Sequence, residues 1–278
     1  MITAKRTIGS YLFSLLLLSF SLFAKAQKAY TTADSAYTFS LLEKVDHFAA
    51  VSEYDSADRY CQLALEISTR KKFLRGEAHT RIKIADMMLN KRELKQVGAH
   101  DSISLRIGLQ LKDPLLIALS YYQLGLLATY QNRLDEGLAL FNRALLIYFE
   151  KAQSVTTAVI YNDIGYMYGQ KSDLDNQLEW LMKALRLYDI NGDLAGTAQT
   201  LNNIATGLNE AGRIKEAFPY LLRSFAIREK LGNKMNLALI HNNAAQLYMR
   251  VDSLDQAIEH QQMGLKYAEQ TGNKGNLA

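Results

Sequence analysis

The feature that most constrains this chain is a repeat with a period of 40 residues. Apolar residues recur at that interval where a turn between two helices is expected, and a column of alanines keeps the same register. The first column is Tyr54, Leu94, Leu134, Leu174, Ile214 and Leu254, and the second is Ala78, Ala118, Ala158, Ala198, Ala238 and Ala278. Periods of 20 to 50 residues are typical of arrays in which each unit packs on its neighbours. The sequence therefore predicts a repeat array.

Each unit has the pattern of a helical hairpin. Apolar residues fall at steps of three and four in residues 118–130 and again in 134–148, with the polar turn 131–133 between them. A further column holds small residues, which allow two helices to approach closely. Its members are Ala85, Gly125, Gly165, Ala205 and Ala245. With only two prolines in 278 residues, the pattern indicates an all-α chain.

Residues of characteristic type at fixed positions on the two helices give the hairpin a resemblance to a known family. The positions that carry it are Leu124, Gly125, Gly137, Phe141 and Ala144, followed one period later by Ile164, Gly165, Tyr168, Leu181 and Ala184. They resemble the tetratricopeptide repeat. The resemblance is strong from residue 118 and weaker in the first two units, where Asp101 replaces the usual aromatic residue. It implies a right-handed superhelix, or solenoid, of about six stacked hairpins over 37–278, with the first helix of each hairpin on the concave side.

The two ends of the sequence add further expectations. Residues 275–278 repeat the start of a first helix, matching Asn236, Leu237 and Ala238, so we expect a seventh unit truncated at Ala278 and a longer parent protein. At the other end, Lys5 and Arg6 precede an apolar stretch and Ala24-Lys25-Ala26. This pattern predicts a signal peptide over 1–26, cleaved after Ala26, and export to the periplasm. The alternative to cleavage is a retained N-terminal anchor. Residues 27–36 are expected to lead into the array.

The charge and the cysteine content exclude several function classes. Without residues 1–26 the chain holds 29 basic and 28 acidic residues, a balance that gives no basis for nucleic-acid binding. The single cysteine, Cys61, excludes a disulfide framework and is expected to be buried. The five histidines show no metal-ligand spacing, and no nucleophile or phosphate-loop motif is present. Residues 189–193 begin like a calcium loop, but Leu194 and Thr200 break that pattern, which favours a turn. We expect no enzyme activity, metal or cofactor in this chain.

Paired polar residues in mid-helix are the candidate site. Asn162-Asp163, Asn202-Asn203 and Asn242-Asn243 occupy one position in three consecutive units, although asparagine is a mediocre helix former. These amides either bridge neighbouring helices or bind a ligand, and the sequence leaves both open. The family resemblance implies a groove lined by Asn162, Tyr166, Gln170, Asn202, Asn209, Glu210, Asn242, Gln246 and Arg250.

The leading functional interpretation is a non-enzymatic, exported scaffold whose groove binds a protein or an extended peptide. The alternative is the sensor region of a membrane-bound signal transducer. In that case a transmembrane helix and a histidine kinase or similar effector would follow Ala278, and any membrane tether would lie there.

Overall fold

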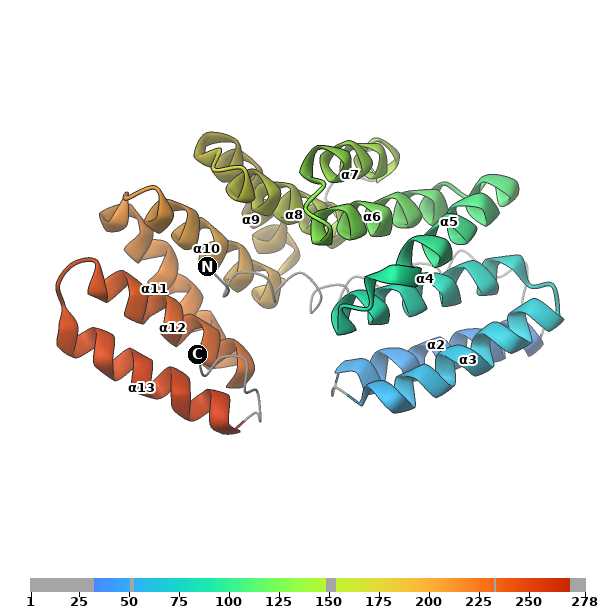
Figure 1. The fold of residues 1–278 in the computed structure, drawn as a ribbon, viewed down its shortest axis with the longest axis horizontal. Coiled ribbons are helices and arrows are strands. Elements are labelled where there is room, and N and C mark those ends of the chain that lie inside the picture. The colour runs from blue at the N-terminus through green and yellow to red at the C-terminus, as the bar shows by residue number, and fades with distance from the viewer. Residues whose placement is uncertain (1–32, 51–52, 149–153, 233, 271–278) are drawn as a thin grey trace. The chain divides into compact units, whose positions relative to one another are not determined.

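The computed structural model describes residues 33–50, 53–148, 154–232 and 234–270 (Figure 1). Within these ranges the chain has twelve α-helices and no strand, which confirms the all-α class. None of the described helices combines the length and apolar character needed to cross a membrane. The predicted signal peptide, its cleavage site and residues 275–278 lie outside the described residues.

The helices alternate between a first helix, A, and a second helix, B, in each hairpin. The A helices are α2 (Ala33–Ala50), α4 (Leu74–Lys91), α6 (Pro114–Tyr130), α8 (Val155–Gln170), α10 (Leu194–Glu210) and α12 (Lys234–Met249). The B helices are α3 (Tyr54–Arg70), α5 (Leu94–Leu111), α7 (Leu134–Tyr148), α9 (Leu174–Asn191), α11 (Ile214–Leu231) and α13 (Leu254–Gln270). All six B helices begin at the residues of the first sequence column. The array was expected from residue 37, whereas α2 already begins at Ala33.

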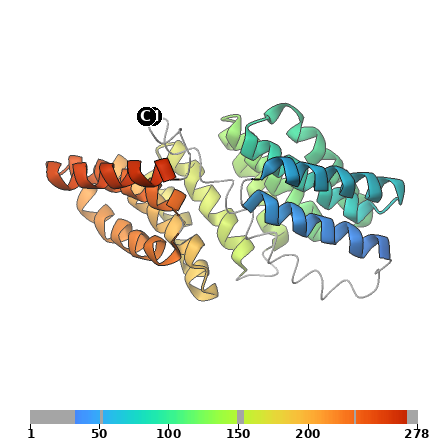
Figure 2. The ribbon, with the colours of Figure 1, turned by 90° about the horizontal axis from the view of Figure 1, so that it is seen from below.

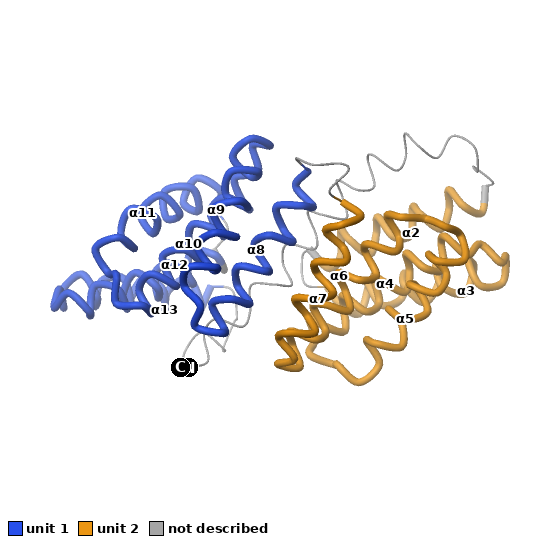
Figure 3. The backbone as a smooth tube through the Cα atoms, turned by 90° about the horizontal axis from the view of Figure 1, so that it is seen from above, with its two compact units in different colours: residues 1–3, 153–278 blue, residues 4–152 orange. Residues whose placement is uncertain are grey.

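The chain divides into two compact units (Figure 3). The N-terminal unit contains α2 to α7, and the C-terminal unit contains α8 to α13. In each unit the two helices of a hairpin pack along one another, as Figure 2 also shows, and each B helix except the last packs on the next A helix. This is the stacking that the repeat predicts, because a single hairpin cannot bury its own apolar face.

Left-handed backbone positions mark the helix ends. Among the described residues, the intervals between these positions are 20 or 40 residues, that is, half of the sequence period or one full period. They are Lys72, Arg92, Lys112, Asn132, Ser172, Gly192, Gly212, Gly232 and Asp252. Glycine accepts a positive φ without strain, and three of the nine positions use it. Each of these nine chain reversals is therefore encoded locally, by one residue next to a helix C-terminus.

The segment that resembled a calcium loop is the turn between α9 and α10. Gly192 has a φ of +69° there, and the Asp193 carboxylate accepts a 2.9 Å hydrogen bond from the backbone N–H of Gly196. Asp189 accepts bonds of 2.9 and 3.0 Å from the Arg223 guanidinium. One carboxylate caps a helix and the other forms an ion pair, so the turn interpretation is correct.

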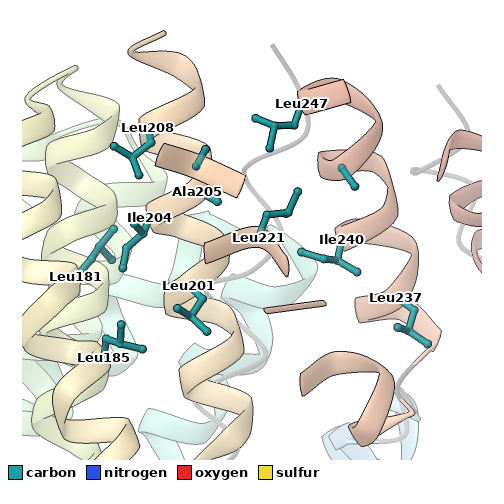
Figure 4. Close-up of a cluster of buried hydrophobic side chains, with 12 residues drawn as sticks. Leu181, Leu185, Leu201, Ile204, Ala205, Leu208, Leu221, Leu237, Ile240 and Leu247 are labelled. Atoms are coloured by element: carbon teal, nitrogen blue, oxygen red, sulfur yellow. The ribbon is translucent and has the colours of Figure 1, made fainter. Parts of the chain in front are cut away.

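The apolar core lies between successive helices. In the C-terminal unit, buried leucines and isoleucines from α9, α10, α11 and α12 meet in one cluster, shown in Figure 4. The alanines of the second column are buried in every unit that the structure describes. At Gly125 and Gly165 an added Cβ would lie 2.6 Å from Phe141 and 2.7 Å from Leu181. These glycines therefore let helix A lie directly against the B-helix side chains.

Two single residues lie inside B helices. Cys61 is buried as expected, with its Sγ 3.7 Å from the Met87 Sδ, and burial raises the pKa of its thiol to about 12. Pro219 lies inside α11, which continues as one helix from Ile214 to Leu231.

Candidate functional site

The A helices of the C-terminal unit contact one another directly. Helix α10 contacts both α8 and α12, whereas the contacts among α9, α11 and α13 are fewer. This agrees with a solenoid whose A helices lie on the concave side, as the family resemblance implies. The A-helix face carries the residues that the sequence proposed for a groove.

The first asparagine of the first two pairs accepts a bridge from the next repeat. The Asn203 side-chain amide donates a 3.1 Å hydrogen bond to the Oδ1 of Asn162, and the Asn243 amide donates one of 2.7 Å to the Oδ1 of Asn202. The Thr200 hydroxyl also donates to Asn162, at 3.1 Å. Asn162 and Asn202 are only 8% and 5% exposed. The bridging role that the sequence left open is therefore present at both positions, and their burial is not what an exposed groove lining requires.

The two donors of these bridges are more accessible than the asparagines that accept from them. Asn203 and Asn243 are half-buried, whereas Asn162 and Asn202 are buried. The Oδ1 of Asn203 accepts a 3.1 Å bond from the Gln199 side chain, so this amide is held from two sides. Neither donor is among the residues that the family resemblance places in the groove. The bridges join residues 41 rather than 40 positions apart, and no column with a 40-residue period carries that offset.

Asn242 differs from its equivalents. It is half-buried, and within the described part of the chain its Oδ1 has no hydrogen-bond partner although that atom is buried. An added Cβ on Gly264 would lie 2.4 Å from the same oxygen. The Asn242 side chain thus packs against α13, in space that this glycine leaves.

Tyr166 brings a phenol to the same face. It is half-buried, and burial followed by the Asp163 and Glu210 carboxylates raises its pKa to about 12. Burial also raises the pKa of Glu210. The phenol therefore keeps its proton at neutral pH and lies close to two carboxyl groups from α8 and α10.

The remaining predicted positions lie at the C-terminal ends of the A helices. Gln170 and Gln246 are exposed. Arg250 donates from Nη1 to the Asn209 Oδ1 at 3.0 Å and to the Asn209 backbone carbonyl. This contact also spans 41 residues. The spacing of 41 residues between contacting A-helix residues is thus found at Asn209 and Arg250 as well as at the two asparagine bridges.

The N-terminal unit has charged groups where the C-terminal unit has amides. Lys83 on α4 forms a buried ion pair with Asp46 on α2. Asp86 and Asp101 are also buried, and neither Asp86 Oδ1 nor either Asp101 oxygen has a hydrogen-bond partner among the described residues. Burial raises the pKa of Asp86 to about 7, against the opposing effect of Lys83, and raises that of Asp101 well above its usual value. One lysine thus faces several carboxyl groups in the core of this unit.

These groups do not form a metal centre. Within the described ranges, no three His, Cys, Asp or Glu side chains are placed to hold a metal ion.

Comparison with known families accounts for the repeat. Two models of the tetratricopeptide repeat match the chain, over residues 158–191 and 196–270. Residues 158–191 and 196–270 are tetratricopeptide repeats. In this family's terms, the bridges described above join the A helices of consecutive tetratricopeptide repeats. No curated protein sequence is significantly similar to the chain.

Solved structures share the fold at low sequence identity. BtubC (BKLC) from P. vanneervenii is 17% identical with a TM-score of 0.64, covering 87% of this chain and 93% of that one. Aspartyl phosphate phosphatase F from Bacillus subtilis is 17% identical with a TM-score of 0.65, covering 100% and 78%. A Rap protein complexed with Competence and Sporulation Factor is 14% identical with a TM-score of 0.63, covering 86% and 67%. At these identities the similarity establishes the tetratricopeptide repeat fold alone.

The buried carboxyl groups predict an unusual pH dependence. An unfolded aspartate titrates near pH 4, so between about pH 4 and 7 the folded protein binds a proton at Asp86 that the unfolded chain has lost. The free energy of unfolding should therefore fall as the pH rises through this window. The Asp86→Asn variant lacks this titrating carboxyl group. Its free energy of unfolding, relative to that of the wild type, should therefore rise by on the order of 3 kcal/mol between pH 4 and 7.5.

Urea melts followed by circular dichroism at both pH values measure the difference. The exposed Asp175→Asn on α9 serves as the control. A difference between Asp86→Asn and wild type that is the same at pH 4 and 7.5 would contradict the prediction.

Proposed function

We propose that this protein is a non-catalytic scaffold whose C-terminal unit binds an extended peptide or protein segment along α8, α10 and α12. The observation that carries the proposal is the pair of half-buried amides Asn203 and Asn243, which occupy equivalent positions in successive repeats and are oriented by hydrogen bonds to buried partners. A side-chain amide both donates and accepts, as a peptide backbone does. Amides repeated along a concave wall suit an extended main chain.

The surroundings of these amides support the same partner class. Tyr166, Gln246 and the Asn209–Arg250 contact surround them with polar groups of mixed character, which suits hydrogen bonding more than attraction to one sign of charge. The near balance of acidic and basic residues agrees with this. The Rap protein of similar fold is complexed with Competence and Sporulation Factor, which supports a proposal of this partner class.

The test compares two substitutions that remove the same hydrogen bond. A ligand is first selected from an immobilised peptide library with the wild-type protein. Asn202→Ala and Asn243→Ala then each remove the bridge between α10 and α12, but only Asn243→Ala also removes the accessible amide. We expect Asn243→Ala to lower affinity by about 1–3 kcal/mol more than Asn202→Ala does, as measured by titration calorimetry.

Thermal melts of both variants show whether each remains folded at the temperature of the titration. The exposed Gln262→Ala on α13 is the amide control and should bind as the wild type does. Equal losses of affinity in the two asparagine variants would mean that the amides only hold the helices together.

We also propose that the protein is exported to the periplasm, on the basis of the charged, apolar and Ala24-Lys25-Ala26 segments of the N-terminus. Mass spectrometry of protein recovered from a Gram-negative host should find Gln27 as the first residue. Recovery of intact Met1 in the membrane fraction would instead indicate a retained anchor. A role as the sensor region of a signal transducer is the alternative function, and a membrane span encoded downstream of Ala278 would favour it.

A further inference from the structure

Two histidines that are distant in sequence meet in the last hairpin. His241 on α12 and His260 on α13 are 19 residues apart, and their Nδ1 atoms lie 3.0 Å from each other. His241 is 6% exposed and His260 is half-buried. Since no third metal-ligating side chain joins them in the described part of the chain, the contact is a hydrogen bond between two imidazoles.

This hydrogen bond exists in one protonation state of the two facing nitrogens. One Nδ1 carries a proton and donates, and the other presents its lone pair and accepts. Protonation of the accepting Nδ1 would place two N–H groups against each other at that distance, and it would make that ring positively charged. The rings would then have to separate.

The surroundings of the two rings offer little to stabilise a positive charge on either imidazole. The ring of Phe225 on α11 lies 4.9 Å from His241 and 5.9 Å from His260, between ring centroids. Tyr248 on α12 stacks on His260 at 5.3 Å, and Tyr267 on α13 lies 5.7 Å from His241. Burial, and then His260, lowers the pKa of His241 to about 4. Burial also lowers that of His260, with Glu259 on α13 acting in the opposite direction.

We propose that the His241–His260 hydrogen bond is an acid-sensitive latch that holds α13 against α12. The neutral pair closes the hairpin, and uptake of a proton by the accepting Nδ1 opens it. Because the folded state disfavours the charged form, the stabilisation is complete above the usual histidine range near pH 6.5 and is lost as the pH falls toward 4. The direction is opposite to that expected for Asp86 in the other unit.

The position of the latch gives it a consequence for the array. In the described chain α13 packs mainly on α12, and Leu254 and Ile258 on α13 are exposed, so little besides the α12 interface holds α13 in place. Helix α12 also carries Asn243 and Gln246. Acidification is therefore expected to weaken ligand binding, a consequence that rests on the proposed function.

Hydrogen–deuterium exchange of the free full chain tests the latch without any ligand. With exchange corrected for intrinsic rates, protection in 234–249 and 254–270 should fall about tenfold or more between pH 7 and pH 5, while protection in α10 changes less. The His241→Phe/His260→Phe variant keeps two rings in the aromatic cluster and removes both titrating groups. Its protection in α12 and α13 should be the same at the two pH values.

Two further variants keep the test decisive. His260→Gln retains a donor for the His241 ring and removes the second imidazole, so it should be less acid-sensitive than the wild type even if the double variant does not fold. His47→Phe, at an exposed position on α2, is the control and should remain as acid-sensitive as the wild type. The proposal is overturned if wild-type protection is unchanged at pH 5, or if the variants lacking the pair lose protection as the wild type does. A ligand screen that finds no partner would affect the proposed function and leave this result standing.

Discussion

The close approach of helices through small side chains is the constraint on which the rest of the array depends. At Gly125 and Gly165, helix A touches the side chains of Phe141 and Leu181 so closely that a methyl group would collide with them. Such contacts set the thickness of each hairpin and thus the distance to the next. The hairpins stack so that the short side chains of Asn202 and Asn243 reach one another across neighbouring A helices.

The two units use that proximity in chemically different ways. In the C-terminal unit the facing polar groups are neutral amides, which satisfy one another at little cost in desolvation. In the N-terminal unit Lys83 faces Asp46 and lies near Asp86, and burying several carboxyl groups around one lysine opposes folding unless protons are retained. Asp101 stands where the equivalent residues are Phe141 and Leu181, so this unit gives up apolar packing as well. The polar C-terminal face is consequently the better candidate for binding, and the charged cluster of the N-terminal unit responds to pH.

Much of the fold could be predicted from the sequence because the period is regular. Columns at 40 residues located the B helices and the buried alanines, and the broken calcium-loop pattern predicted the turn at Gly192. The candidate site was predicted only in part. The family resemblance placed Asn162 and Asn202 in the groove. It could not show that the bridges join residues 41 positions apart, with Asn162 and Asn202 buried and Asn203 and Asn243 half-buried. The pairing of His241 with His260 depends on the register between two antiparallel helices, which no repeat column encodes.

The central claim is that side-chain amides couple successive A helices, and a double-mutant cycle on stability tests it most directly. The free energy of unfolding of the wild type is compared with those of Asn202→Ala, Asn243→Ala and the double variant in urea melts at pH 7. A hydrogen bond between these residues predicts a coupling energy of about 0.5–1.5 kcal/mol, so the double variant should lose less than the sum of the single losses. Losses that simply add would contradict the bridge, and with it the account of how the accessible amides are held in place.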